Sequence, residues 1–234
     1  MRVVINCCSF SKTHHTGIGR YTANLVKFLA KIDRQNRYSL YTTRGFFNIK
    51  KRIPSKGAGN FSIRWDWLKK GVDGILKEGD IYHAPSPEMI TTRRAKVIVT
   101  VHDLIYKTCP QSHTQETVLS TDQQFESFIP SASKIICSSR STLKDLHSYF
   151  SVDPVKTCCI YQGIDKESFY PMNEEEKESS RRVLASHGIS GPYILFVGTI
   201  EPRKNLEGVF HAMASLKGKK TFPGKLVVIG MPGW

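Results

Sequence analysis

The sequence has no apolar run approaching the roughly 20 residues that a membrane-spanning helix needs. Residues 1–8 are apolar, but a polar Ser-Lys-Thr-His-His segment follows them instead of the small residues of a signal-peptide cleavage site. These residues therefore predict a first β-strand and not an export signal. Of the 234 residues, 40% are hydrophobic and 23% are charged, which is typical of a globular protein.

Cysteine pairs with the Cys-x-x-Cys spacing of metal and redox sites are also absent. Adjacent cysteines on a strand point to opposite faces, which makes them poor joint ligands for one metal ion. We therefore expect reduced core thiols in a cytosolic protein, and no metal site. The six cysteines are Cys7, Cys8, Cys109, Cys137, Cys158 and Cys159.

Acidic residues are scarce in the first quarter of the chain. Residues 1–60 contain 12 lysines and arginines and a single acid, Asp33, so this quarter carries +11 of the total charge of +14. Such asymmetry predicts an anionic partner, which could be nucleic acid, an acidic membrane surface or a phosphorylated substrate. No nucleic-acid-binding module is visible, so nucleic acid is the weakest of the three and is not expected.

Two segments mix bulky apolar side chains with cations. They are FFNIKKRIPSK at residues 46–56 and FSIRWDWLKK at residues 61–70. In a peripheral membrane contact, the rings of these segments would enter the headgroup layer and their cations would bind anionic lipid. An ordinary basic surface over buried aromatic residues is the alternative.

Apolar strand-like runs alternate with helical segments along the chain. Several runs are continuous and β-branched, as expected for strands buried on both faces of a parallel sheet. This alternation predicts an α/β fold with a doubly wound, Rossmann-like sheet. Strands are expected at residues 3–7, 38–42, 61–63, 81–83, 97–101, 134–137, 157–161, 194–197 and 226–229, and helices at 19–32, 66–76, 117–128, 142–150, 174–187 and 205–216.

The strand pattern is interrupted between residues 165 and 190 by Pro171 and the charged segment NEEEKESSRR. We predict an N-terminal Rossmann-like domain over residues 1–168, an interdomain linker over 169–190, and the start of a second domain over 191–234. The last segment contains only strand, helix and strand, too little to bury a stable core alone. We therefore expect a truncated second domain, and interpret the chain as the front part of a longer protein.

A glycine-containing segment, HTGIGRYTANL, follows the first strand. Gly17 and Gly19 would let the backbone bend at the mouth of the sheet before a helix begins. The third glycine of a dinucleotide fingerprint is replaced by Thr22, and no acid closes the second strand, so NAD binding is disfavoured. A substrate phosphate at the helix start, near Arg20, remains open.

The segment YILFVGTIEPRKNL combines an apolar strand, a turn at Gly198 and two cations, Arg203 and Lys204, beside a helix start. Backbone N–H groups and the helix dipole favour an anion at such a position. The guanidinium can bind two oxygens, and the ammonium acts as a point charge. The pattern predicts a site for a phosphorylated ligand, with a solvated basic turn as the alternative.

The strand in VIVTVHDLIY ends with His102 and Asp103. Open α/β sheets bind their ligands at the carboxyl ends of such strands. His102 could donate to a sugar hydroxyl or lie beneath a reacting carbon, while Asp103 could hold the loop or orient the imidazole. A purely structural histidine is the alternative.

Five motifs occur in order: GIGRYTANL, VHDLIY, IICSSRSTLKDL, IYQGIDKESFYP and ILFVGTIEPRKNL. Together they resemble the retaining glycosyltransferases of family four, which have the GT-B fold. EPRKN with the preceding VG is the most specific part, and the resemblance spans nearly the whole chain. It implies two Rossmann-like domains facing each other across a cleft, with the acceptor on the first and a nucleotide-sugar donor on the second.

The resemblance also implies roles for individual residues and excludes a cofactor. Cationic side chains would take up the leaving-group charge, so neither a metal ion nor another cofactor is expected. Attack on the face from which the nucleotide departs would retain the anomeric configuration. Arg203 and Lys204 would bind the donor diphosphate, His102 would lie near the transferred sugar as the catalytic residue, and Gly17, Gly19, Asp103 and Gly198 would line the substrate cleft.

One family feature is missing from the sequence. Members carry a Glu-x7-Glu motif late in the second domain, and the chain stops before that region. Glu167 and Glu175 have the spacing, but they lie across the predicted linker, and we interpret the match as coincidence. By itself the chain is therefore expected to have little transferase activity.

By this resemblance, the expected function is transfer of a hexose from a nucleotide-sugar to a lipid-linked or oligosaccharide acceptor in surface polysaccharide or lipopolysaccharide synthesis. The forms HDL and EPRKN suggest mannose, again by resemblance alone. A catalytically incomplete fragment that docks only an acceptor or a membrane is the alternative. With either function, the protein is expected to be cytoplasmic. If it binds the cell membrane, it would do so peripherally, at the inner face.

Overall fold

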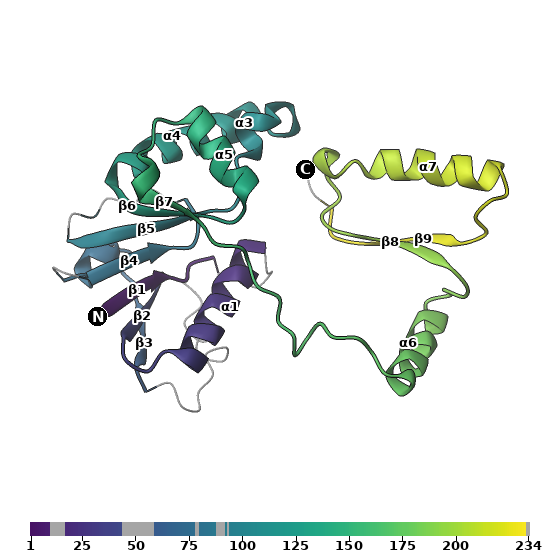
Figure 1. Ribbon diagram of the computed structural model, residues 1–234, viewed down its shortest axis with the longest axis horizontal. Coiled ribbons are helices and arrows are strands. Elements are labelled where there is room, and N and C mark those ends of the chain that lie inside the picture. The colour runs from purple at the N-terminus through teal and green to yellow at the C-terminus, as the bar shows by residue number, and fades with distance from the viewer. Residues whose placement is uncertain (10–16, 44–58, 78–79, 88–91, 93, 233–234) are drawn as a thin grey trace. The chain divides into compact units, whose positions relative to one another are not determined.

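The computed structural model describes residues 1–9, 17–43, 59–77, 80–87, 92 and 94–232. The chain forms two compact units, Met1–Asp165 and Lys166–Trp234 (Figure 1). The predicted membrane segment at residues 46–56 lies outside the described residues. No helix of the described part is long and apolar enough to cross a bilayer.

The first unit is built on a seven-stranded sheet of the described residues with the order β3-β2-β1-β4-β5-β6-β7, and every neighbouring pair is parallel (Figure 1). The chain order reverses between β1 and β4, which is the switch point of a doubly wound sheet. The predicted α/β class is therefore confirmed. The strands are β1 Arg2–Asn6, β2 Arg37–Thr42, β3 Phe61–Trp65, β4 Asp80–Ala84, β5 Ala95–Val101, β6 Ala132–Cys137 and β7 Thr157–Cys159.

Helices cover both faces of this sheet, and α4 and α5 have side-chain caps at their starts. In α5, Ser139 is the N-cap, and its side chain accepts from the backbone N–H of Thr142 at 3.0 Å. The helices of the first unit are α1 Gly17–Ile32, α3 Ile105–Thr108, α4 Gln115–Ser131 and α5 Arg140–Tyr149, with single 3₁₀ turns at Val72–Gly74, Pro110–Ser112 and Pro154–Lys156.

The helix predicted over residues 66–76 is wrong, since the segment contains only the 3₁₀ turn Val72–Gly74. The carboxylate of Asp66 accepts the backbone N–H groups of Lys70 and Gly71, at 3.0 and 2.8 Å. These N–H groups are therefore not available for a helical ladder. Gly71 also has φ 89°, which ends any right-handed helix at that point.

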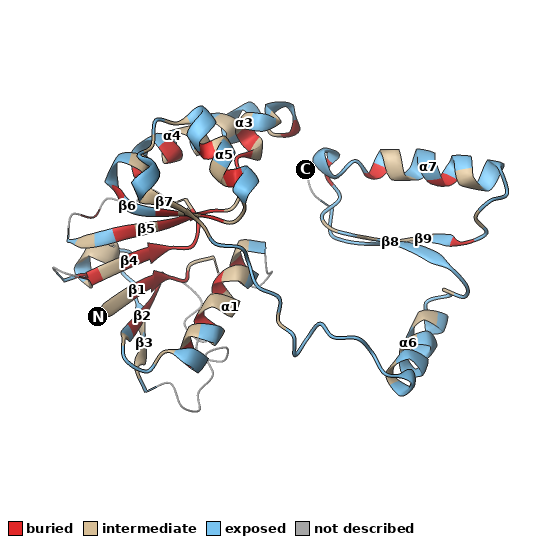
Figure 2. Cartoon of the chain, viewed as in Figure 1, coloured by how far each residue is buried: buried red, intermediate tan, exposed pale blue. Residues whose placement is uncertain are grey.

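Two apolar clusters hold the sheet and its helices together (Figure 2). On one face, Val26 of α1 packs with Ile5 and Leu40 of the sheet, and all three are almost fully buried. On the other, the larger cluster includes Phe125 and Phe128 of α4. Each such side chain contributes about 1.5–3 kcal/mol on burial, so these packed faces are the main source of stability.

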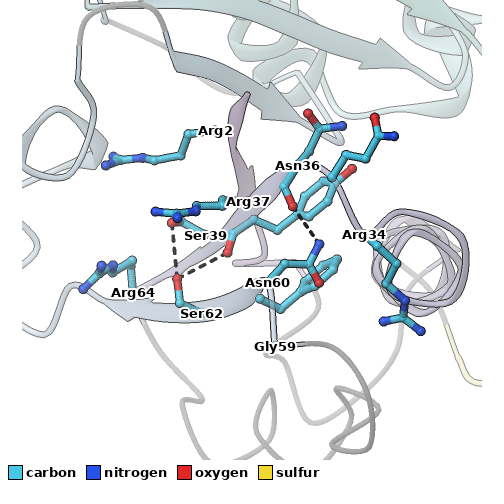
Figure 3. Close-up of a pocket in the computed structure, with 12 residues that line it drawn as sticks. Arg2, Arg34, Asn36, Arg37, Ser39, Gly59, Asn60, Ser62 and Arg64 are labelled. Atoms are coloured by element: carbon cyan, nitrogen blue, oxygen red, sulfur yellow. Dashed lines mark hydrogen bonds between the residues drawn. The ribbon is translucent and has the colours of Figure 1, made fainter.

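Asn60 connects the start of β3 to the turn that precedes β2. Its side-chain N–H₂ donates to the carbonyl of Asp33 at 3.1 Å and to that of Asn36 at 2.7 Å, and Figure 3 shows the second of these bonds. Next to it, the rings of Tyr38 and Phe61 stack with their centroids 4.4 Å apart. These contacts fix the amino-terminal ends of both strands.

Helix α1 begins at Gly17, two residues earlier than predicted. Gly17 and Gly19 therefore lie in its first turn and not in a bend that precedes it. Neither glycine has a positive φ. Gly19 is buried, whereas a Cβ at Gly17 would meet no heavy atom within 4 Å. Ordinary helical geometry therefore explains both positions.

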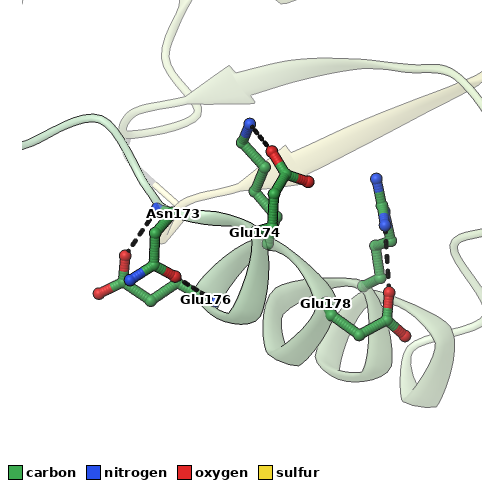
Figure 4. A network of polar contacts seen from close by, with 6 residues as sticks. Asn173, Glu174, Glu176 and Glu178 are labelled. Carbon is green, nitrogen blue, oxygen red and sulfur yellow. Dashed lines mark hydrogen bonds and ion pairs between the residues drawn. The ribbon is translucent and has the colours of Figure 1, made fainter.

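The second unit contains a parallel pair of strands joined by a helix. Its first helix, α6, has a capping box at Asn173 (Figure 4): Glu176 donates its N–H to Asn173 and returns its carboxylate to the Asn173 N–H, both at 2.9 Å. The acidic first turn suits the helix dipole. The elements are α6 Glu174–Ser186, β8 Tyr193–Val197, the 3₁₀ turn η4 Pro202–Lys204, α7 Leu206–Gly218 and β9 Lys225–Ile229.

The loops after β8 and β9 approach each other closely. The N–H of Gly198 donates to Ile229, and that of Ile200 donates to Met231, both at 2.9 Å. A Cβ on Gly230 would lie 1.8 Å from the carbonyl oxygen of Gly198. Only glycine fits there, and this contact fixes the loop that leads into η4.

Candidate active site

A cavity of about 680 Å³ opens at the carboxyl ends of β1, β4 and β5 in the first unit. These strands flank the switch point, where doubly wound sheets bind their ligands. Helix α4 and the start of α1 complete the wall. Polar lining side chains include Ser9, Ser86, His102, Asp103, Tyr106 and Thr117.

The imidazole of His102 is held through both ring nitrogens. Nε2 lies 2.8 Å from the carbonyl oxygen of Pro85, and Nδ1 lies 3.0 Å from Nε2 of Gln162. A carbonyl only accepts, so Nε2 of the histidine carries the proton. Nδ1 is then the acceptor for the amide of Gln162. One tautomer of the neutral ring is therefore selected.

Burial lowers the pKa of His102, and this effect outweighs the Pro85 carbonyl and the charge of Asp103, which both raise it. The ring is therefore neutral at pH 7. The edge of Tyr21 packs against it with the ring centroids 4.9 Å apart and the planes at 82°. A neutral, oriented imidazole facing a cavity can accept or donate a hydrogen bond, but it adds no positive charge.

Asp103 makes no hydrogen bond to the imidazole among the described contacts. Its carboxylate accepts the backbone N–H of Ile105 at 3.2 Å, at the start of α3. Of the two roles considered for this residue, the geometry fits holding the loop. The orientation of His102 comes from Pro85 and Gln162, which the sequence did not indicate because they lie 17 and 60 residues away.

The backbone of His102 is also anchored. Its carbonyl oxygen accepts from the hydroxyls of Ser138 and Thr142, at 2.6 and 3.0 Å. Both donors lie at the junction of β6 and α5. This contact fixes the end of β5 relative to the neighbouring strand, so the imidazole is placed by rigid elements.

A second histidine lies behind the first. His83 in β4 is buried, and its Nε2 lies 2.9 Å from Oγ1 of Thr100. Burial, and to a lesser extent His102, lower the pKa of His83 to about 4. The hydroxyl of Tyr21 is 3.4 Å from the same Oγ1. Single polar residues inside strands carry no sequence signal, so this group was not predicted.

In the second unit, Arg203 and Lys204 lie in η4, directly before α7. The guanidinium of Arg203 is 2.5 Å from a carboxylate oxygen of Glu201, whose side chain is only 2% exposed. Part of the positive charge of Arg203 is therefore balanced by an acid of the same loop. Asn205 then caps α7, and its side chain accepts the N–H of Gly208 at 3.2 Å.

Lys204 is exposed, and no ion pair to it occurs within the described residues. Gly198 closes β8 and lies at the base of the same loop. The cationic loop, the strand end and the helix start are thus adjacent within one unit. Such a combination can bind an anion.

These features define the class of protein. A doubly wound sheet followed by a second strand–helix–strand unit has the element order of the GT-B fold, and residues 15–168 match the model of Glycosyltransferase Family 4. The match covers more than half of the chain. The chain belongs to glycosyltransferase family 4.

Two curated relatives are glycosyltransferases. O-antigen chain mannosyltransferase B of Escherichia coli is 26% identical over 245 residues, covering 94% of this chain and 61% of the relative. D-inositol 3-phosphate glycosyltransferase of Jonesia denitrificans is 25% identical over 111 residues, covering 46% of this chain and 26% of the relative. The chain thus spans about three-fifths of the length of the E. coli mannosyltransferase.

Solved structures of Anabaena HepE have a similar fold. The complex with UDP matches with a TM-score of 0.66 and 17% identity, covering 100% of this chain and 62% of HepE. The complex with UDP-glucose matches with a TM-score of 0.65 and 14% identity, covering 97% and 60%. This likeness confirms the GT-B type of α/β fold.

Proposed function

We propose that the protein transfers a hexose from a nucleotide-sugar to a lipid-linked or oligosaccharide acceptor, with retention, in surface polysaccharide or lipopolysaccharide synthesis. Family membership and the two glycosyltransferase relatives support the reaction class. The HepE complexes with UDP-glucose and UDP support a nucleotide-sugar donor. The name of the E. coli relative supports mannose as the hexose and O-antigen-like polysaccharide as the product.

The observation that carries the proposal is the fixed, neutral His102 facing a cavity at the switch point. Its Nε2–H is occupied by the Pro85 carbonyl, which leaves Nδ1 as the acceptor position. In the proposed complex, a sugar hydroxyl replaces the Gln162 amide and donates to Nδ1. This reverses the expected direction of the hydrogen bond, in which His102 was the donor.

The donor diphosphate is assigned to the second unit. Lys204 offers an exposed ammonium, and Arg203 offers the N–H groups that Glu201 does not engage. The N-terminus of α7 adds its dipole. We propose that these groups take up the negative charge of the leaving nucleotide, so the reaction requires neither a metal ion nor another cofactor.

The test is transfer of mannose or glucose to a lipid-linked oligosaccharide acceptor, from GDP-mannose or UDP-glucose with EDTA present, by a protein that contains this chain together with a Glu-x7-Glu region. We expect transfer from one donor to persist in EDTA. His102→Ala should lower the rate about 2- to 10-fold, because one hydrogen bond to a neutral, partly buried group is lost.

His147→Ala is the matched control. This histidine is exposed on α5, where its ring bonds the Thr157 hydroxyl at 3.0 Å, and its loss should leave the rate unchanged. Equal rates for the parent and His102→Ala would contradict the role of His102. Loss of all transfer in EDTA, restored by Mg²⁺, would contradict the metal-independent reaction.

A second candidate function is docking on an anionic membrane without catalysis. The same membrane contact would also place an active enzyme at the membrane surface. Trp67 and Leu68 expose 68% and 50% of their surface, and Lys69 and Lys70 follow them directly. Exposed rings beside cations suit the interface of an acidic bilayer. We propose that the protein is cytoplasmic and binds peripherally through this segment.

Sedimentation with vesicles tests this contact. We expect binding to vesicles of phosphatidylglycerol and phosphatidylcholine but not to phosphatidylcholine alone, since each cation near an anionic surface contributes about 1 kcal/mol. Trp67→Ser with Leu68→Ser should lower the bound fraction about tenfold. Leu119→Ser, at a position on α4 that is 56% exposed, is the control. Equal binding to both vesicle types would contradict the proposal.

A further inference from the structure

A basic pocket lies at the opposite end of the sheet from His102. Its volume is about 630 Å³, and it surrounds the first residues of β1, β2 and β3 (Figure 3). Four arginines line it: Arg2, Arg34, Arg37 and Arg64. Neither the candidate active site nor the loop of Arg203 includes any of these residues.

Strand register places a subset of the lining side chains on one face of the sheet. Ser39 pairs with Ser62, and Arg2 pairs with Arg37. Side chains two residues apart on a strand share a face, so Arg64 joins Ser62. Figure 3 shows the guanidinium groups of these three arginines on the side of the serines, and that of Arg34 on the other side beside α1.

The two serines lie between the outer arginines. Their hydroxyl oxygens are 3.4 Å apart, and Oγ of Ser62 is 3.3 Å from the carbonyl of Tyr38. Arg64 of β3 pairs with Tyr41 of β2, and Tyr41 lies four residues after Arg37. The backbones of Arg37 and Arg64 are therefore about 13 Å apart along the strand direction. Arginine side chains from both ends can therefore reach toward a ligand over the serines.

The charge of this face is only partly neutralised by ion pairs of the described residues. Arg2 is paired with Asp80 at 2.9 Å and also donates to the carbonyl of Ile75. Arg37 and Arg64 are exposed, and within the described residues neither forms an ion pair. Two unpaired guanidinium groups flanking two hydroxyls form a site of oxyanion chemistry, because guanidinium binds phosphate through two N–H groups.

We propose that this face binds a ligand with two or more phosphate groups, through Arg37 and Arg64 at its ends and Ser39 and Ser62 between them. The site shares no residue with the proposed donor loop, and its ligand would be a second phosphorylated molecule. Soluble phosphate compounds and the headgroups of phospholipids share this chemistry. Arg2 contributes less because Asp80 already balances its charge.

The probe is inorganic tripolyphosphate, added to ¹⁵N-labelled protein that carries Arg203→Ala and Lys204→Ala to remove the cations of the donor loop, with Glu201→Gln so that no unpaired carboxylate stays buried. We expect saturable shifts of the Ser39 and Ser62 amide signals. Arg37→Gln with Arg64→Gln should weaken this binding about 10- to 100-fold, less than two fully desolvated charge-assisted contacts would give, because both guanidinium groups are exposed to solvent. Arg34→Gln is the matched control, since it removes one charge from the other side of the pocket.

Absence of shifts at Ser39 and Ser62 would overturn the proposal. Equal weakening by Arg34→Gln would also overturn it, because binding would then reflect only the general charge of this region. Vesicles with phosphatidic acid identify the source: a loss of vesicle binding in Arg37→Gln with Arg64→Gln assigns the site to lipid headgroups. Unchanged vesicle binding, with the tripolyphosphate shifts lost, assigns it to a soluble phosphate compound.

Discussion

Replacing both Arg203 and Lys204 with alanine is expected to lower the affinity for the nucleotide-sugar donor about 10²- to 10⁴-fold. Each charge-assisted contact to a phosphate contributes about 1.5–3 kcal/mol, and two are removed. Titration calorimetry with GDP-mannose and UDP-glucose measures the effect on whichever donor the parent binds. A decrease well below tenfold would contradict the assignment of the diphosphate to this loop.

The ion pair with Glu201 complicates the simple experiment. Arg203 covers a carboxylate that is 2% exposed, so Arg203→Ala leaves a buried negative charge without its partner. Losing one member of such a pair costs about 3 kcal/mol of stability. The Arg203→Ala variant would then lose donor affinity through local unfolding of the second unit, even if the guanidinium never touched the donor.

Glu201→Gln separates the two effects. The amide needs no cation, so Glu201→Gln combined with Arg203→Ala and Lys204→Ala should recover the free energy of unfolding, measured in urea. Donor affinity should remain low in that triple variant and near the parent value in Glu201→Gln alone. Recovery of affinity in the triple variant would show that the cations act only on stability.

Most of the fold could be predicted because its strands are continuous apolar runs, and such runs identify buried parallel strands without knowledge of their neighbours. The strand at residues 97–101, for example, appears as β5 with two added residues at its start. The false helix at 66–76 has a local cause that only coordinates reveal, since Asp66 binds the backbone of Lys70 and Gly71. The four-residue helix α3 is too short to show a helical period.

The position of the candidate site could be predicted from the sequence, but the hydrogen-bond and ion-pair partners of its residues could not. His102 could be predicted as a site residue because it directly follows a buried strand, and open parallel sheets bind their ligands at the carboxyl ends of such strands. Its partners Pro85 and Gln162 come from other strand ends and carry no pattern of their own. Glu201 was visible within EPRKN, but adjacency alone does not show whether an acid pairs with the arginine or faces solvent.

Acid is expected to destabilise the first unit through His83. Burial, with a smaller effect from His102, lowers the pKa of His83 to about 4 in the folded state, against 6.5 for an unperturbed histidine. Between these two values the unfolded chain binds a proton that the folded protein does not. The free energy of unfolding therefore falls as the pH decreases from about 6.5 to about 4, by on the order of 3 kcal/mol.

His83→Gln removes this titration while keeping a polar side chain that can still bond the Thr100 hydroxyl. Urea unfolding of both proteins at pH 7, 5.5 and 4 gives the difference between their pH profiles, in which the titration of the carboxylates cancels. We expect the parent to lose about 3 kcal/mol more than His83→Gln over this range. Parallel profiles would show that His83 becomes protonated without unfolding, and that Thr100 and Tyr21 accommodate a charged imidazole behind His102.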